Sequence, residues 1–188
     1  RPDCLGPEIL ELLAELNRVK PVWVELGLQT IHPASAAYIR RGYDLPVFDA
    51  AVKRLKAIGV RVVVHQILGL PGETPEMMAQ TSHYIGQAGA DGVKLHLLHV
   101  LRNTDLGAEW QAGRVQTWEL TEYIAALELC LRNLPPEVVI HRPTGDGAKR
   151  DLLSPLWSGD KKRVLNAIRR AFERDDLVQG SALSADRK

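Results

Sequence analysis

Residues 59–75 read GVRVVVHQILGLPGETP, and this stretch decides the fold. Val60 to Leu68 is apolar, rich in β-branched residues and too short for a full helix, which is typical of a buried strand. Thr74 and Pro75 then mark a helix start, because a threonine hydroxyl accepts hydrogen bonds from first-turn amides and proline presets the first helical position. The stretch therefore predicts one strand–turn–helix unit.

The same alternation extends in both directions along the chain. Strands are predicted over residues 22–29, 60–68, 92–101 and 138–141, and helices over 5–18, 47–58, 75–88, 117–132 and 161–174, with one or two helical turns over 35–41. A hairpin cannot place a helix between two strands, so this order implies parallel strands joined by right-handed crossovers. The predicted class is α/β. Residues 178–188 are expected to form a frayed tail.

Polar side chains occupy alternate positions of three predicted strands. They are Glu25 and Gln29, then His65, then Lys94 and His96. Burying such groups without partners costs on the order of 1 to 3 kcal/mol each. A shared lumen that holds a polar ligand explains the pattern better than a dry core does. We therefore expect a partial barrel.

Composition narrows the class of protein. The chain has 188 residues, the length of one domain, and its 24 Lys plus Arg against 23 Asp plus Glu give a formal charge of +1. Two cysteines are too few for a disulfide framework or a Cys-rich metal site, so no metal ligands are assigned and a reducing compartment is favoured. The sequence has no apolar run of the ~18 residues that span a membrane, and no signal-peptide pattern. We expect a cytoplasmic protein with no membrane partner.

Five short motifs follow one another in an informative order. They are Arg1-Pro2-Asp3, Glu25-Leu26-Gly27-Leu28-Gln29, Arg41-Gly42-Tyr43, His65 through Gly69-Leu70-Pro71, and the polar strand around His96. Each lies at or near the carboxyl end of a predicted strand, where α/β folds bind ligands. By order and spacing, residues 1–106 resemble the S-adenosylmethionine (SAM) radical enzymes, most closely the Elp3-like branch. The stretch HRPTGD at 141–146 resembles a related group of small bacterial proteins of unassigned substrate.

The resemblance implies the later strands of a partial (β/α)6 TIM-like barrel, entered at the end of the third strand, near Asp3. Residues 1–145 would form the barrel part, and residues 146–188 a basic C-terminal helical extension with a flexible tail. The family ligates a [4Fe–4S] cluster through three closely spaced thiolates, which Cys4 and Cys130 cannot supply. We therefore expect the cluster ligands in a preceding segment of the same protein, and the 188 residues alone to be inactive.

The resemblance also assigns a set of residues to SAM, namely Asp3, Glu25, Gln29, Arg41, His65, Ile67 and Gly69. It implies that Gln29 and Arg41 face the ribose and the carboxylate, and that His65 contacts the ribose. Ile67 and Gly69 would border the adenine. Taken alone, the residues leave simpler roles open: a turn cap for Gln29, a solvated helix end for Arg41 and a core histidine for His65.

The function implied is cleavage of SAM at the cluster to a 5′-deoxyadenosyl radical, which takes a hydrogen from a tRNA or a small molecule. Lys94, His96 and Arg102 are expected on the substrate side of the lumen. Two alternatives stay open. One is a cluster-free module that binds a nucleotide or RNA. The other is a barrel hydrolase or aldolase that uses Lys94, or a zinc site formed by His65, His96, His99 and His141.

Charge is unevenly distributed along the chain. From residue 141 onward there are 11 Lys plus Arg and 7 Asp plus Glu, against 13 and 16 before it. The basic residues within 149–174 make RNA contact a candidate function, although charged helix faces are usually only solvated. Trp110, Trp118 and Trp157 are candidate stacking platforms for bases, with Trp118 also suited to anchoring its helix.

Overall fold

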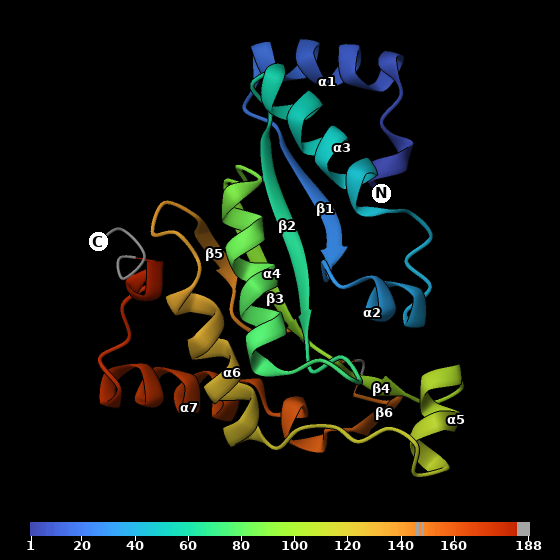
Figure 1. The fold of residues 1–188 in the computed structure, drawn as a ribbon, viewed down its shortest axis with the longest axis vertical. Coiled ribbons are helices and arrows are strands. Elements are labelled where there is room, and N and C mark those ends of the chain that lie inside the picture. Colours follow the sequence, from blue (N-terminus) through green and yellow to red (C-terminus); the bar gives the residue numbers. More distant parts are fainter. Residues whose placement is uncertain (146, 148, 184–188) are drawn as a thin grey trace.

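Four parallel strands form the centre of the molecule (Figure 1). In the computed structural model, which describes residues 1–145, 147 and 149–183, they are β1 (Trp23–Gln29), β2 (Arg61–Leu68), β3 (Gly92–Leu97) and β5 (Val139–Arg142), in the spatial order β1-β2-β3-β5. Helical crossovers join successive strands, which is the connection that parallel strands require. The predicted α/β class and the alternation of strands and helices are confirmed.

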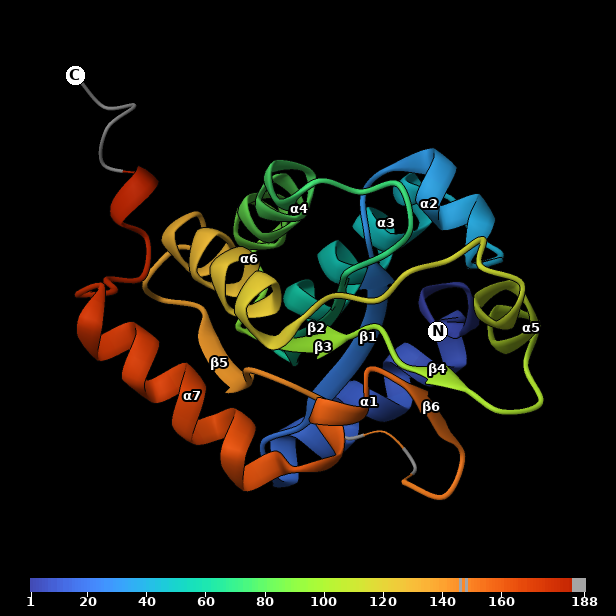
Figure 2. The same cartoon turned by 90° about the horizontal axis from the view of Figure 1, so that it is seen from below.

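Three helices cover one face of this sheet (Figure 2). They are α3 (Leu45–Ala57), α4 (Pro75–Gln87) and α6 (Leu120–Arg132). The strands present alternate apolar residues to these helices, among them Leu26, Val64 and Leu95, which are fully buried. Helix α4 begins where predicted, because the Thr74 hydroxyl accepts a hydrogen bond from the Met77 amide at 3.3 Å. The main hydrophobic core lies between this helical layer and the sheet.

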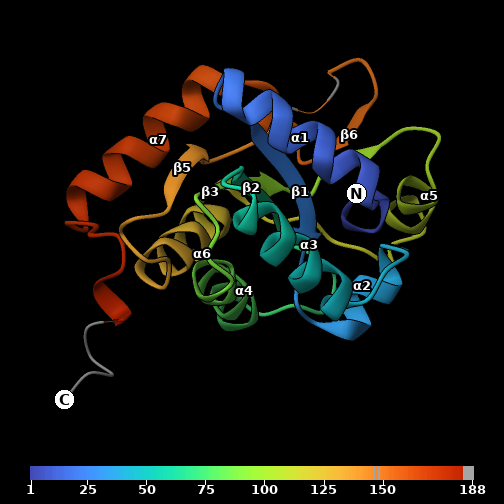
Figure 3. The same ribbon diagram turned by 90° about the horizontal axis from the view of Figure 1, so that it is seen from above.

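The opposite face of the sheet, called here the inner face, carries the polar residues. Its positions alternate with the core positions and include Trp23 and Glu25 of β1, His65 of β2, and Lys94 and His96 of β3. All five side chains are exposed or half-buried. Helix α1 (Pro7–Val19) lies at the amino ends of the strands and does not cover this face (Figures 1 and 3). Trp23 and Glu25 are therefore exposed on this face, whereas Gly145 lies against the ring of His96.

Shorter elements gather at the carboxyl ends of the strands (Figure 1, bottom). They are α2 (Pro33–Tyr38), α5 (Asp105–Gln111), the 3-10 turn η2 (Leu156–Gly159) and an antiparallel ribbon of β4 (Val100–Leu101) and β6 (Leu152–Ser154). Loops converge at this edge in α/β folds, so side chains from distant parts of the sequence meet there.

The structure corrects three boundaries of the sequence prediction. The strand expected over 92–101 ends at Leu97, because residues 100–101 leave the sheet and pair with β6. The helix expected from Thr117 begins at Leu120, after Glu119 as its N-cap. Residues 2–4 form a 3-10 turn, η1 (Pro2–Cys4), and not the strand end that was expected around Asp3. Neither α5 nor β6 was predicted.

Helix α7 (Lys161–Arg174) has its predicted bounds and packs against α6 and η2. Beyond it, the side chain of Gln179 donates hydrogen bonds to the Pro135 and Val138 carbonyls, at 2.7 and 2.8 Å. This part of the expected frayed tail is therefore held against the molecule, while residues 184–188 lie outside the described residues. Among the helices described, none has the length and apolar character needed to cross a membrane.

Candidate functional site at the inner face and the carboxyl edge of the sheet

A charged cluster occupies the middle of the inner face. The Glu25 carboxylate accepts hydrogen bonds from Lys94 Nζ and, at 2.7 Å, from His65 Nε2. The three residues come from β1, β2 and β3, and the parallel register sets Lys94 directly beside His65. The bond from Lys94 lowers the pKa of the Glu25 carboxyl, and the bond from His65 adds to this while burial opposes it. Glu25 is therefore ionised and shared by two donors.

His96 extends this cluster by one step toward the carboxyl end. Its ring stacks on that of His65, with centroids 4.9 Å apart and planes 27° apart. Burial, and then the neighbouring charges of His65, Arg142 and Lys94, lower the pKa of His96 to about 4. Gly145 lies against Nδ1 of His96, and a Cβ at that glycine would stand 3.0 Å from this nitrogen. His96 is therefore a neutral imidazole near neutral pH.

Aromatic and cationic side chains lie at the amino end of the inner face. The Arg61 guanidinium lies over the Trp23 ring, 4.9 Å from its centroid, and His141 meets the same ring edge-on at 5.1 Å. Gly92 makes room for His141, since a Cβ there would stand 2.6 Å from the imidazole. His141 thus lies apart from the stacked pair of His65 and His96.

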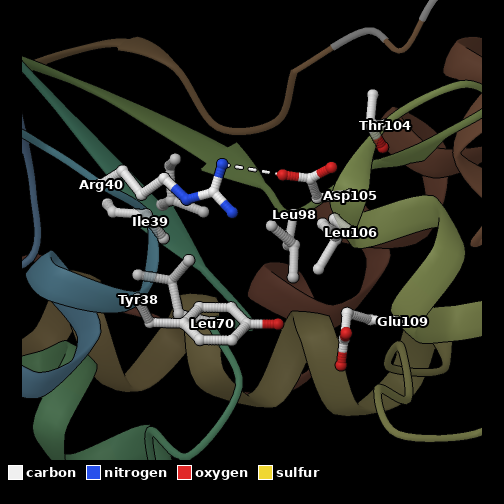
Figure 4. Close-up of a pocket in the computed structure, with 10 residues that line it drawn as sticks. Tyr38, Ile39, Arg40, Leu70, Leu98, Thr104, Asp105, Leu106 and Glu109 are labelled. Carbon is white, nitrogen blue, oxygen red and sulfur yellow. Dashed lines mark ion pairs between the residues drawn. The ribbon is translucent and has the colours of Figure 1, made fainter.

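A cavity of about 520 Å³ opens at the carboxyl edge (Figure 4). Its walls combine the ends of β2 and β3 with α2 and α5, and consist of Tyr38, Ile39, Arg40, Ile67, Leu70, Leu98, Thr104, Asp105, Leu106 and Glu109. The ion pair of Arg40 with Asp105, 2.7 Å long and largely exposed, joins the end of α2 to the start of α5. The aliphatic side chains favour an apolar, flat group, and the polar ones lie around it.

The structure places Gln29 at the end of β1 and Arg41 between α2 and α3, in the connection from β1 to β2. Arg41 donates hydrogen bonds to the carbonyls of Leu28, Thr30 and Tyr43, at 3.1, 2.7 and 3.0 Å. Its guanidinium also lies 4.9 Å from the Tyr43 ring centroid. Gln29 has a left-handed φ of 62° and folds its amide over Gly27, where a Cβ would stand 2.2 Å from Nε2. Most of Arg41's hydrogen-bonding capacity thus goes to the loop itself.

The remaining predicted residues divide into two groups. Ile67 lies in the wall of the cavity, and Gly69 follows β2 with a φ of +87°, a conformation that suits glycine. Asp3 instead pairs with Arg1 at 2.7 Å in the first turn of the chain. Arg102 is exposed beyond β4, where its amide donates to the Asp151 carbonyl. The structure therefore brings together Glu25, His65, Lys94 and His96, and leaves Asp3 and Arg102 outside this group.

Sequence reasoning missed two features of the site. Arg40, next to the predicted Arg41, is the arginine that lines the cavity. Glu73 is buried and accepts a hydrogen bond of 2.5 Å from the Thr30 hydroxyl, which ties the loop after β2 to the loop after β1. The signal for Glu73 was its place directly after Leu70-Pro71-Gly72, at the start of the turn into α4.

The metal alternatives find no support in the described part of the chain. Within it, no group of three or more His, Cys, Asp or Glu side chains is arranged to hold a metal ion. Cys4 is exposed, whereas Cys130 is buried and its thiol has a pKa raised to about 12 by that burial. These two cysteines are thus unsuited to a cluster, and the histidines named for a zinc hydrolase do not form its site.

Two of the candidate base-stacking tryptophans are engaged within the fold. The Trp157 indole donates a hydrogen bond of 2.9 Å to the Trp118 carbonyl, and its ring lies 5.7 Å from that of Tyr123. Both tryptophans pack against the hydrophobic core. They anchor α6 and η2 and are not free platforms for bases.

Two family profiles and several known proteins match this chain. Residues 1–85 match the family profile described as the radical SAM superfamily, and residues 90–174 match the radical SAM C-terminal domain. The chain is 38% identical over 180 residues to the uncharacterised protein YtqA of Bacillus subtilis and 36% identical over 184 residues to protein YhcC of Escherichia coli. These alignments cover 96% and 97% of the chain but 56% and 59% of the relatives, so the chain spans little more than half their length.

The fold has a counterpart among solved structures. The archaeal Elp3 of Methanocaldococcus infernus superimposes with a TM-score of 0.79 at 22% identity, over 95% of this chain and 41% of that one. This likeness confirms the fold expected from the sequence. The two profiles and the two relatives establish that the chain belongs to the radical SAM superfamily.

Proposed function

We propose that this chain forms the SAM-binding part of a radical SAM enzyme. The observation that carries the proposal is the cavity at the carboxyl ends of β2 and β3, with Ile67 in its wall. This is the edge at which α/β folds bind ligands, and its volume of about 520 Å³ suits a small molecule. Ile67 is also the residue that the family resemblance sets against adenine.

The cavity suits the nucleoside portion of SAM. Ile67, Leu70 and Leu98 offer an apolar surface for a purine. Arg40 and Asp105 at the mouth are exposed and offer one charge of each sign to the polar parts of the ligand. The described residues thus fit the nucleoside, and their proposed role is to bind it, orient it and exclude water from it.

The 188 residues do not fit the iron–sulfur cluster. Its three thiolate ligands cannot come from an exposed Cys4 and a deeply buried Cys130. The proposal therefore requires ligands from outside these residues. In such a complete enzyme, SAM supplies the 5′-deoxyadenosyl group for hydrogen abstraction, and the inner face, with Lys94 and His96, orients the substrate.

The test is SAM binding by the full-length protein, measured by calorimetry on wild type and the variant Ile67→Ala. Loss of the apolar wall should weaken binding about fivefold or more, since an aliphatic side chain contributes ~1 kcal/mol or more to such a contact. Ile9→Ala is the matched control, because Ile9 lies on the exposed side of α1. Equal affinities of the two variants, or absence of SAM binding in wild type, would overturn the proposal. Reconstituted wild type should also release 5′-deoxyadenosine.

A second proposal concerns RNA, and α7 supports it. Lys162, Arg163 and Arg170 line one shallow hollow beside α6 together with a single carboxylate, Asp160, which accepts from the Arg163 amide, and among the described residues no carboxylate forms an ion pair with the three cations. By contrast, Arg169 and Arg174 pair with Glu173 and Asp175. Three unpaired cations on one helix face favour a polyanion. We propose that this face contacts RNA phosphates.

This second proposal predicts salt-dependent RNA binding. Binding of an unstructured RNA oligonucleotide is measured by fluorescence anisotropy at several salt concentrations. The triple variant Lys162→Glu/Arg163→Glu/Arg170→Glu should lower the slope of log affinity against log salt by about 2, because each phosphate contact contributes ~0.7 to that slope. A triple reversal at Arg18, Lys20 and Lys53, which are exposed elsewhere, should leave the slope unchanged. Equal slopes for the two triple variants would contradict the proposal.

A further inference from the structure

Positive charge outweighs negative charge on the inner face of the sheet. Among its strand positions, Arg61, Lys94 and Arg142 are cationic and Glu25 is the one carboxylate. We propose that Lys94 and Arg142 bind an anionic group of a ligand, a phosphate or a carboxylate, on this face. The inference deepens the proposed function by naming a substrate class, and it rests on that function only in treating the ligand as a substrate.

Lys94 and Arg142 are neighbours across two strands of the sheet. Lys94 of β3 pairs with Arg142 of β5, because the register shifts after Val93 and passes over His141. Neighbouring strands lie about 4.8 Å apart, so the two cations start from adjacent points of the sheet. Like charges in such positions repel each other and destabilise the sheet unless a counter-charge lies between them. The pair therefore favours occupation by an anion.

Glu25 supplies a counter-charge to Lys94, but Arg142 has no such partner among the described residues. Lys94 donates to Glu25, and the same carboxylate also accepts from His65. The side chain of Arg142, in contrast, forms no hydrogen bond or ion pair with any residue among 1–145, 147 and 149–183. It is nonetheless half-buried. Its N–H donors are not among the buried groups without a partner, so they are available to solvent or to an anion.

The charges of Lys94 and Arg142 both act on the imidazole of His96 and help to lower its pKa to about 4. The register agrees with this, because His96 is the next inner-face residue of β3 after Lys94, the partner of Arg142, and it stacks on His65. A neutral His96 adds no charge of its own, so the local surplus is positive. This surplus repels a metal ion and attracts an anion.

The geometry of the donors selects the anion class. A guanidinium binds phosphate or carboxylate through two parallel hydrogen bonds, and an ammonium beside it adds a third. Ile67, in the wall of the cavity, is the register partner of His96. Lys94 and Arg142 lie closer than these two residues to the amino ends of the strands. Lys94 and Arg142 do not line the cavity, so the ligand proposed here extends from Ile67 along the inner face and directs its acidic group toward them.

The test uses the purified full-length protein without SAM, so its outcome does not depend on the cofactor. Inorganic phosphate and acetate are titrated separately, and binding is followed by calorimetry and by the NMR signal of the His96 ring. One or both anions should bind in the millimolar range and raise the pKa of His96, because the anion neutralises Arg142 and Lys94. Arg142→Gln should weaken binding about tenfold, as expected for loss of a charge-assisted bidentate contact.

Two further variants make the outcome decisive. Arg61→Gln removes a cation of the same face that lies over Trp23 at the amino end, and should leave affinity unchanged. Arg142→Lys keeps the charge but loses the two parallel hydrogen bonds, so it should bind more weakly than wild type and more tightly than Arg142→Gln. Phosphate binding alone would identify a phosphorylated ligand, and acetate binding a carboxylate. The inference is overturned if neither anion binds, if Arg61→Gln loses as much affinity as Arg142→Gln, or if saturation leaves the pKa of His96 unmoved.

Discussion

His65 and His96 stack across neighbouring strands at a centroid distance of 4.9 Å, yet they have different partners. His65 donates to the Glu25 carboxylate at 2.7 Å. His96 has no carboxylate partner among the described residues, and burial and nearby cations disfavour its charged form. One imidazole is thus tied to an acid, while the other stays neutral at the centre of the inner face.

This difference predicts how stability depends on pH. The pKa of His96 is about 4 in the folded chain, below its ordinary value of 6.5, so the unfolded chain binds more protons between these values. The contribution of His96 to stability is therefore complete above pH 6.5 and is lost as the pH falls toward 4. Urea unfolding at pH 7 and pH 5 should show a smaller difference in unfolding free energy for His96→Gln than for wild type. An equal difference would mean that His96 is already protonated at pH 5.

The shared carboxylate predicts an unequal cost for two ion pairs. Glu25→Gln removes the acceptor of both Lys94 and His65 and leaves a half-buried ammonium without a counter-charge, so it should destabilise the chain by about 1 to 2 kcal/mol. Glu173→Gln breaks an exposed pair with Arg169 at 3.9 Å and should cost less than about 0.5 kcal/mol. Chemical denaturation of both variants measures the contrast, and equal costs would show that the Glu25 cluster is solvated like a surface pair.

Adjacent arginines should behave differently on substitution. Arg41→Ala removes hydrogen bonds to three carbonyls, one at the end of β1 and two in the connection that follows, and should destabilise the chain by about 2 to 3 kcal/mol. Arg40→Ala breaks only an exposed ion pair and should cost less than about 0.5 kcal/mol. Thermal unfolding of the two variants gives the comparison. A larger loss for Arg40→Ala would reverse the roles that the structure gives them.

The two arginines also show where sequence reasoning reaches its limit. The motif at Arg41-Gly42-Tyr43 was recognisable, but the direction of its side chain depends on the backbone just before it. Arg40 has a left-handed φ of 53°, which turns the chain so that Arg41 faces the loop while Arg40 lines the cavity. Nothing in the residue types fixes that turn, so the family motif alone could not identify the arginine at the cavity.

Strands were predictable in proportion to their burial. The run from Val60 to Leu68 was recognisable because β2 lies in the middle of the sheet and is apolar along most of its length. β4 and β6 have two and three residues, and their pairing joins segments about fifty positions apart, so no local pattern marks them. The inner-face group of Glu25, His65, Lys94 and His96 was predictable for the opposite reason, since polar residues at alternate positions of successive strands must share one face.

The ion pair of Arg40 with Asp105 joins two walls of the cavity, and its disruption should affect ligand binding more than folding. Asp105→Arg places two cations at the mouth, which should separate α5 from α2 and weaken SAM binding by the full-length protein about threefold or more. The double variant Arg40→Asp/Asp105→Arg restores opposite charges in exchanged positions and should recover most of the affinity. The pair is largely exposed, so thermal unfolding should change little in either variant. If the double variant folds with an unchanged unfolding temperature and still does not recover affinity, the prediction is wrong. That result would show that Arg40 or Asp105 contacts the ligand itself, and that the charge pair does not hold the two walls together.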